Sequence, residues 1–229
     1  MNVQKNQQLW ETIFQNKEWG KYPSEELIRF VARNFYAAPD RKKIKILELG
    51  LGTGANVWYM TREGFSVSGI EWSEIGCNRC AKRLEQEGLS PFLETIKQGD
   101  YAEKIDEFAD DYFDAWIDCA SLTCNTFDKA KTIVEKAMKK LKVGGKFFSI
   151  TPMEGTFGLF EDKNVGYHAC MPVEGNYAHT GFVRYVTDKD IQSLYSGENY
   201  SITQFYTVKT FANDVMMNAM AVIEGVRNA

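Results

Sequence analysis

The sequence predicts an α/β fold: a mostly parallel sheet of seven strands, helices on both faces and an antiparallel strand near the end of the chain. Three observations predict it. Apolar strand-like runs alternate with helix-like stretches, the joints between them are short, and a glycine-rich turn follows the first run. Strands that alternate with helices in this way pair in parallel, because each helix carries the chain back across one face of the sheet.

Residues 1–38 precede the first predicted strand, and we expect them to be helical and to cover the sheet. They carry seven aromatic side chains: Trp10, Phe14, Trp19, Tyr22, Phe30, Phe35 and Tyr36.

Five short apolar runs bounded by turn residues predict the first five strands. They cover residues 43–50, 66–73, 92–100, 112–119 and 146–152. Helices are expected between them at 55–64, 74–88 and 129–145. Gly64 and Gly88 close the first two helices, because glycine readily adopts the backbone conformation that ends a helix.

The chain changes character after residue 152. Glycine and aromatic residues are scattered without a period over 153–181, so we expect an irregular insertion there. Thr187 and Asp190 predict the start of a helix at 187–197, since their spacing suits a capping pair. Two runs at 200–211 and 215–225, separated by three residues, predict a hairpin and hence an antiparallel last strand.

The formal net charge of −4 argues against a nucleic-acid or anionic-membrane surface, because neither would meet a matching basic field. No apolar run approaches the ~20 residues of a membrane span. The N-terminus also lacks the apolar core of a signal peptide. We therefore expect a soluble cytoplasmic protein, either a monomer or a homodimer.

The five cysteines are an odd number in a chain with no secretion signal, which argues against a disulfide framework. Cys77 and Cys80 form a C-x-x-C pair within a helical stretch. No second pair or nearby histidine completes a metal site. We expect small buried core residues here, and no metal.

The glycine-rich turn lies in "ILELGLGTGANVWYM", residues 46–60. Glycine lets the backbone approach a ligand closely at the carboxyl ends of parallel strands. Gly50, Gly52 and Ala55 fit the dinucleotide pattern G-x-G-x-x-G/A. Glu71 follows at about the 20-residue spacing at which such sites place an acid for the ribose. A nicotinamide enzyme is one interpretation of this turn.

The acidic residues near the turn favour a different ligand. Glu48 lies at a buried strand end, where a carboxylate is costly unless paired and where it would repel a pyrophosphate. Glu48, Glu71 and Asp100 are expected to end three neighbouring strands along one rim, with no basic residue among them. This rim suits a cationic cofactor without phosphate, and S-adenosylmethionine carries a sulfonium and an ammonium.

Five segments in order resemble the motifs of class I S-adenosylmethionine-dependent methyltransferases, which have a Rossmann-like fold. "ILELGLGTGAN" resembles the first motif, "GIEWS" the ribose-binding segment and "QGDY" the adenine-contacting segment. "FDAWIDCASL" resembles the fourth-strand motif, and "LKVGGKFFSI" the turn into the fifth strand, with valine in place of the usual proline. "WGKYPSEELIRF" resembles the lid of small-molecule members.

The resemblance implies a site for S-adenosyl-L-methionine, with S-adenosyl-L-homocysteine as the product. Glu71 would bind the ribose hydroxyls, and Trp72 would lie beside the adenine. The implied cofactor-binding residues are Trp19, Tyr22, Glu48, Gly50, Gly52, Gly54, Asn56, Glu71, Trp72, Ser73, Gly99, Asp100, Tyr101, Asp118, Cys119 and Ala120.

Length and composition indicate one domain, since 229 residues with 44% hydrophobic content suffice for one well-packed core. Within it we expect four parts. They are a helical cover or lid (1–38), a cofactor-binding core (39–152), a substrate-side insertion (153–186), and a C-terminal helix with a strand pair (187–229).

The expected insertion holds the candidates for catalysis and acceptor binding, because loops on a fixed scaffold commonly carry recognition. His168 and His179 are candidate bases, since histidine titrates near neutral pH; either is alternatively a surface loop residue. Tyr167 and Arg184 are candidate substrate-binding residues. Arg184 could hold an acceptor carboxylate or phosphate, or only pair with Asp188. Four further residues of the segment cannot be ranked: Glu161, Asp162, Glu174 and Tyr177.

The acceptor class is bounded by exclusion. The fourth-strand motif reads "DCAS" and not the N/D-P-P-Y/F of many base and glutamine N-methyltransferases, and the chain has no basic track for nucleic acid. We expect methyl transfer to an O or N nucleophile of a small molecule such as a sugar, an amine or a phosphorylated metabolite. Two alternatives stay open: an NAD(P)-dependent oxidoreductase, and a catalytically silent methyltransferase-like partner subunit.

Overall fold

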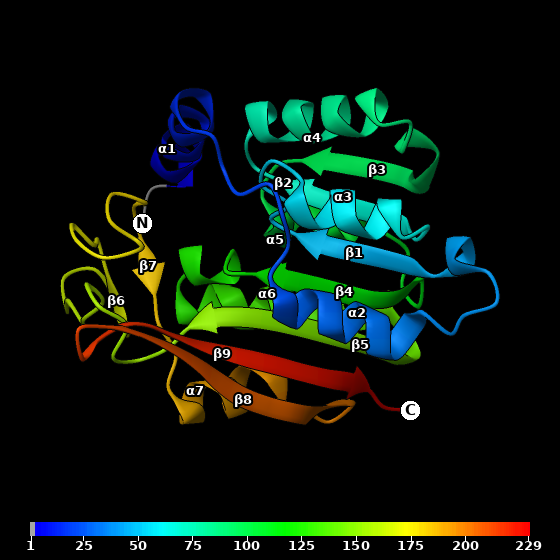
Figure 1. The fold of residues 1–229 in the computed structure, drawn as a ribbon. Helices are drawn as coiled ribbons and strands as arrows, with labels where there is room; N and C mark the ends of the chain where they lie inside the picture. Colours follow the sequence, from blue (N-terminus) through cyan, green and yellow to red (C-terminus); the bar gives the residue numbers. More distant parts are fainter. Residues whose placement is uncertain (1–2) are drawn as a thin grey trace.

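The computed structural model describes residues 3–229. Its strands are β1 (Lys45–Leu49), β2 (Ser66–Glu71), β3 (Leu93–Gln98), β4 (Phe113–Cys119), β5 (Leu141–Pro152), β6 (Ala169–Cys170), β7 (Val183–Arg184), β8 (Tyr200–Ala212) and β9 (Val215–Arg227). Seven of them form one sheet in the order β3-β2-β1-β4-β5-β9-β8 (Figure 1). Strands β1 to β5 are parallel, and β9 is antiparallel to both β5 and β8. The predicted mostly parallel sheet with an antiparallel hairpin strand is confirmed.

Helices cover both faces of this sheet. They are α1 (Val3–Asn16), α2 (Glu25–Phe35), α3 (Ala55–Arg62), α4 (Glu74–Gln86), α5 (Tyr101–Lys104), α6 (Phe127–Lys140) and α7 (Asp188–Tyr195). Short 3-10 turns occur at Arg41–Lys43, Ser90–Phe92, Ile105–Glu107 and Leu122–Cys124. Helices α2, α3 and α4 pack on one face, and α5, α6 and α7 on the other (Figure 1).

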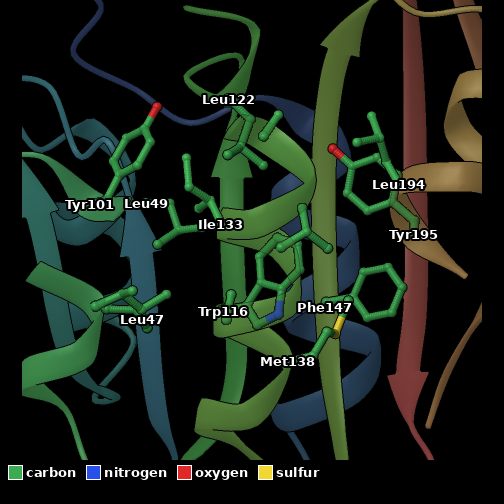
Figure 2. Close-up of a cluster of buried hydrophobic side chains, with 14 of the residues drawn as sticks. Leu47, Leu49, Tyr101, Trp116, Leu122, Ile133, Met138, Phe147, Leu194 and Tyr195 are labelled. Atoms are coloured by element: carbon green, nitrogen blue, oxygen red, sulfur yellow. The ribbon is translucent and has the colours of Figure 1, made fainter. Parts of the chain in front are cut away.

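The side chains of β1 show how the sheet divides the core. Successive side chains of a strand point to opposite faces, so Ile46 faces α2 and α3 while Leu47 and Leu49 face the α6 side. On that second side Trp116 of β4 stacks on Phe147 of β5, with ring centroids 5.3 Å apart (Figure 2). Glu48 shares the face of Ile46, which places a carboxylate beneath the start of α3.

The helix expected at 129–145 is wrong at its C-terminal end. α6 stops at Lys140, and β5 already begins at Leu141, which pairs with Phe113 of β4. Gly144 has a φ of +80°, which an α-helix does not tolerate. Leu141 continues the helical apolar spacing by coincidence, because it is buried as the first residue of a strand.

The C-terminal elements follow their local signals. Thr187 and Asp190 form a reciprocal capping box at the start of α7. β8 and β9 are joined by two residues, Asn213 and Asp214, and not by the three expected. Both have positive φ, as the tightest hairpin turns require and as Asn and Asp tolerate best. Between β5 and α7 the chain is irregular apart from the short β6–β7 pair.

All five cysteines are free thiols. Cys80 is buried against the glycine turn, and Cys77 is half-buried. Within residues 3–229, no group of three or more His, Cys, Asp or Glu side chains is arranged to hold a metal ion. No helix in this range has the length and apolar character needed to cross a membrane.

Candidate functional site

Two clefts open at the carboxyl ends of the central strands. The Trp72 cleft is lined by Trp10, Phe14, Trp19, Gly50, Gly52, Glu71, Trp72, Tyr101, Cys119, Ala120, Ser121 and Cys124. The Glu48 cleft is lined by Trp19, Gly20, Tyr22, Ser24, Glu26, Glu48, Gly50, Leu51, Gly52, Thr53, Ala55, Asn56, Cys119, Ala120, Ile150, Val208, Asn218 and Met220. The two share Trp19, Gly50, Gly52, Cys119 and Ala120, so they are two halves of one groove around the glycine turn.

The three glycines of the turn are required for two different reasons. All three have positive φ: +70° at Gly50, +56° at Gly52 and +87° at Gly54. A Cβ would lie 2.4 Å from the Ser121 Cβ if placed on Gly50, and 2.4 Å from the Cys80 Sγ if placed on Gly54. On Gly52 its nearest neighbours would be ring atoms of Phe14 at 3.6 Å and Trp19 at 3.9 Å, which is ordinary van der Waals contact without a clash. Gly50 and Gly54 serve packing, and Gly52 keeps the groove clear.

The N–H groups of the turn are already used inside the protein. Gly50 and Leu51 donate to the Ile70 carbonyl at 2.9 and 3.2 Å, and Gly54 donates to the Leu51 carbonyl at 2.9 Å. Gly52 donates to Glu71 Oε2 at 2.7 Å. A pyrophosphate at such a turn is normally held by free backbone N–H groups at a helix N-terminus. These four groups are not free to do so.

Glu48 occupies the place where a phosphate would lie. Its side chain is 1% exposed, and Oε1 accepts a hydrogen bond from Asn56 Nδ2 at 2.6 Å, on the first turn of α3. Oε2 is buried and accepts no hydrogen bond of normal geometry from residues 3–229. Burial raises the pKa of this carboxyl to about 8, against the effect of the Asn56 hydrogen bond. A buried acceptor with an unused oxygen suits a ligand that brings a positive charge.

Glu71 and two aromatic rings shape the Trp72 cleft. Glu71 is buried and accepts N–H hydrogen bonds from Gly52 at 2.7 Å and from Ser73 at 2.9 Å. Burial nevertheless raises the pKa of Glu71. The rings of Trp72 and Tyr101 are parallel, 2° apart, with centroids separated by 6.3 Å. A planar ligand group therefore meets an aromatic wall beside a carboxylate.

The prediction of a rim without basic residues is wrong at Asp100. Its Oδ2 accepts from Lys129 Nζ at 2.5 Å, and its Oδ1 accepts from the Ala102 N–H at 2.9 Å. Lys129 belongs to α6, and its ammonium also lies 5.3 Å from the centroid of Trp72. The residues next to each strand end gave no sign of this lysine, because it reaches the rim from a helix 29 positions further along the chain.

Of the sixteen predicted cofactor-binding residues, eleven line the groove and five do not. Those that line neither cleft are Gly54, Ser73, Gly99, Asp100 and Asp118. Asp118 is completely buried behind the groove, where it accepts hydrogen bonds from the Ser121 and Ser149 hydroxyls and the Leu122 N–H. It fixes the turn after β4 and thereby positions Cys119 and Ala120.

Residues 46–145 match a family profile described as a methyltransferase domain. Geranyl diphosphate C-methyltransferase from Streptomyces coelicolor A3(2), solved with S-adenosyl-L-homocysteine, has a similar structure. Its TM-score is 0.70 at 11% identity, and 99% of each chain is covered. A SAM-dependent methyltransferase from Methanosarcina mazei has a TM-score of 0.66 at 15% identity, with 82% of this chain and 94% of that chain covered. Residues 46–145 therefore resemble a methyltransferase domain, and the chain has the Rossmann-like fold of these enzymes.

The methyltransferase domain and its fold support S-adenosylmethionine as the cofactor. The same fold also occurs in the cyclase SpnF, with a TM-score of 0.68 at 14% identity and 99% and 95% of the two chains covered. The fold alone therefore does not fix the reaction. No curated protein matches this chain in sequence.

Helix α1 lies over the methyltransferase domain's groove and supplies residues that the sequence motifs did not indicate. Phe14 and Trp10 both line the Trp72 cleft, and the three rings of Trp10, Phe14 and Trp19 are in mutual contact with centroids 5.4 to 5.6 Å apart. Trp10 and Phe14 are four residues apart on one helix, and this spacing puts them on one face. The four-residue spacing of these two aromatic residues is the sequence signal that could have indicated them as lining residues.

Glu11 attaches α1 to the methyltransferase core. Its carboxylate accepts from the N–H groups of Glu74 at 2.5 Å and Ile75 at 3.2 Å, and from the Ser73 hydroxyl at 2.8 Å. A carboxylate at the N-terminus of α4 satisfies N–H groups that have no partner within the helix. The cover is therefore held by a helix cap supplied from 62 positions away.

The four candidate residues of the insertion line neither half of the groove. His179 is exposed, and His168 lies in a separate cluster where its Nδ1 is 2.7 Å from Asp190 Oδ2. Tyr167 donates to Asp190 Oδ1 at 2.9 Å in the same cluster. Arg184 is buried and donates to the Asn125 carbonyl, not to Asp188.

Tyr177, which the sequence left unranked, lies closer to the groove. Its hydroxyl contacts the sulfur of Met220, a lining residue of the Glu48 cleft, at 3.3 Å. Burial raises the pKa of Tyr177, and the nearby charges of Cys124 and Asp118 raise it further.

Proposed function

We propose that this chain transfers a methyl group from S-adenosylmethionine to an O or N nucleophile of a small molecule: a sugar, an amine or a phosphorylated metabolite. The observation that carries the proposal is Glu48, a buried carboxyl group with an unused oxygen beside a turn in which four N–H groups are already bonded within the protein. An NAD(P)-dependent oxidoreductase would need a pyrophosphate at this position, so the same observation disfavours it.

The groove offers a place for each part of the cofactor. Glu71 keeps lone pairs for the ribose hydroxyls after its two backbone contacts, since a carboxylate has about four acceptor sites. Trp72 and Tyr101 would lie against the adenine. The methionine part would cross the turn toward Cys119 and Ala120, with its ammonium at Glu48.

Methyl transfer depends mainly on the position of the nucleophile relative to the methyl group. Methyl transfer is an in-line displacement, and holding the nucleophile ~3–3.5 Å from the methyl carbon while excluding water supplies much of the rate. Trp10, Phe14 and Trp19 cover the groove and would exclude water from it. His168 and His179 remain candidate bases only if the insertion moves, whereas Tyr177 is already adjacent.

Transfer of labelled methyl from S-adenosylmethionine to panels of small amines, alcohols and sugar phosphates tests the activity. We expect at least one panel to be methylated. Tyr177→Phe should lower kcat about tenfold or more if Tyr177 acts as the base, because it removes the insertion's hydroxyl that contacts the lining residue Met220. His179→Ala should leave kcat within about twofold if the exposed position persists during turnover. Cofactor binding without transfer to any panel would support the silent partner subunit instead.

A further inference from the structure

The Glu48 cleft extends beyond Glu48 and the glycine turn, to which the proposed function assigns the cofactor. Its walls come from the start of α2 with Ser24 and Glu26, from β5 with Ile150, and from the strand pair with Asn218 and Met220. None of its lining residues is Lys, Arg or His. It therefore differs from the Trp72 cleft, where Lys129 approaches the rim.

Glu26 is the carboxylate of this space that remains unpaired. It is half-buried, and among the side chains of residues 6–229 no Lys, Arg or His lies within ion-pair distance of it. The two arginines of α2 are committed elsewhere: Arg29 pairs with Glu25, and Arg33 pairs with Glu224 of β9, each at 2.5 Å.

The same space holds two further oxygen acceptors without a donor. Asn218 Oδ1 and Glu48 Oε2 are both buried and accept no hydrogen bond from the described part of the chain. The cofactor brings one ammonium, which satisfies Glu48. Asn218 Oδ1 then remains a buried acceptor without a donor, which is costly, and Glu26 remains a half-buried carboxylate in the same cleft.

The indole of Trp19 is the aromatic wall beside these acceptors. It lines both halves of the groove and is 39% exposed. Aromatic faces attract cations, most strongly when the cation is partly desolvated. Carboxylate, amide oxygen and indole together are a surface for a positively charged nitrogen.

We propose that the methyl acceptor is an amine that enters as a cation and is held by Glu26, Asn218 and Trp19; this rests on the proposed function. Phosphorylated acceptors are disfavoured because the space offers no basic side chain, and phosphate is held by Arg, Lys or free N–H groups. A sugar is also less suited than an amine, because it brings no positive charge to the Glu26 carboxylate.

The reaction balances without another co-reactant. The ammonium loses one proton to solvent through the Glu26 carboxylate, which frees the nitrogen lone pair. That pair attacks the methyl carbon as the carbon–sulfur bond breaks, and the bond's electrons stay on sulfur as S-adenosylhomocysteine. The positive charge passes from the sulfonium to the methylated nitrogen, where Glu26 and Trp19 stabilise it.

The test compares two probes of equal shape, choline and its uncharged carbon analogue 3,3-dimethylbutan-1-ol. Each is titrated calorimetrically into the full chain saturated with S-adenosylhomocysteine. We expect choline to bind about tenfold or more tighter than the alcohol, as a cation beside a carboxylate and an indole should. Glu26→Gln should reduce the preference to within about twofold, while Glu25→Gln, the neighbouring exposed carboxylate paired with Arg29, should retain it.

Equal affinities of the two probes, no binding of choline, or a preference retained in Glu26→Gln would overturn the amine assignment. These outcomes leave the proposed function intact, provided that S-adenosylhomocysteine binds. If S-adenosylhomocysteine itself does not bind, the proposed function fails first. Unchanged affinity for S-adenosylhomocysteine in Glu26→Gln also shows that the variant is folded.

Discussion

Glu48 and Gly52 decide which cofactor the groove accepts. Glu48 places a carboxyl group beneath the first turn of α3. Gly52 adds no side chain to the groove at the glycine turn. A dinucleotide site has the opposite arrangement, with free N–H groups and no acid at the helix N-terminus. These two residues thus distinguish two cofactor classes that share the same glycine pattern.

Glu48→Gln should change how stability depends on pH. The folded-state pKa of Glu48 is about 8, above the unfolded value of 4.5, so the folded chain binds the proton more tightly. Protonated Glu48 therefore contributes to the free energy of unfolding. This contribution is fully present below pH 4.5 and is lost as the pH rises toward 8. Chemical unfolding of the ligand-free chain gives the free energy of unfolding at pH 5 and at pH 8. The decrease between these two pH values should be smaller in Glu48→Gln than in the wild type. The exposed control Glu25→Gln should lose as much as the wild type, and an unaltered loss in Glu48→Gln would contradict the assignment.

Gly52→Ala and Gly50→Ala should have different effects. At Gly52 the added methyl has room, so we expect a strain cost of about 1 kcal/mol from the positive φ and a loss of S-adenosylhomocysteine affinity of about tenfold or more. At Gly50 the methyl meets the Ser121 Cβ at 2.4 Å, and overpacking should cost a further ~1–3 kcal/mol. Melting temperature and calorimetric affinity measured on both variants separate the effects. Full affinity in Gly52→Ala would show that the cofactor does not cross the turn.

At the scale of elements, α1 covers the Trp72 cleft and Glu11 attaches it to α4, so we propose that α1 acts as a lid. The helix brings Trp10 and Phe14 into the Trp72 cleft, buries Ile13 and Phe14, and is linked to the start of α4 through hydrogen bonds to Glu11. A lid attached in this way can release a cofactor without disturbing the sheet.

Glu11→Ala should loosen α1 without unfolding the core. Loss of a helix cap costs about 1 kcal/mol, and here the loss falls on the contact between α1 and α4. We expect faster tryptic cleavage after Lys17 and Lys21, and faster dissociation of S-adenosylhomocysteine in stopped-flow tryptophan fluorescence. Glu18→Ala is the matched control, because Glu18 is exposed and pairs only with Lys21. Equal rates in both variants would mean that Glu11 does not hold the lid.

The sequence predicted elements well where local spacing determines them, and poorly where distant segments meet. The capping pair Thr187 and Asp190 acts within one turn, so its spacing was sufficient. Lys129 reaches Asp100, and Glu11 caps α4, only through the tertiary fold, which no local pattern records. The boundary at Leu141 was misplaced because a buried strand residue fitted the helical spacing.

At the scale of the whole molecule, the site follows from topology. Parallel strands β1, β2 and β4 bring their carboxyl ends to one edge, and residues from positions 48, 71 and 120 meet there although they are far apart in sequence. This is why the glycine turn and the acids at strand ends could be found from sequence. The insertion between β5 and α7 has no such frame, and its histidines lie outside the groove while Tyr177 is adjacent to it.

The central claim is that the groove binds a cationic, phosphate-free cofactor. Calorimetric titration of the purified chain with S-adenosylmethionine, S-adenosylhomocysteine, NAD and NADP tests it most directly. We predict binding of the two sulfur ligands and none of either dinucleotide, with proton release when S-adenosylmethionine meets Glu48 at neutral pH. Binding of a dinucleotide alone would contradict the account, because Glu48 would then have to lie beside a pyrophosphate.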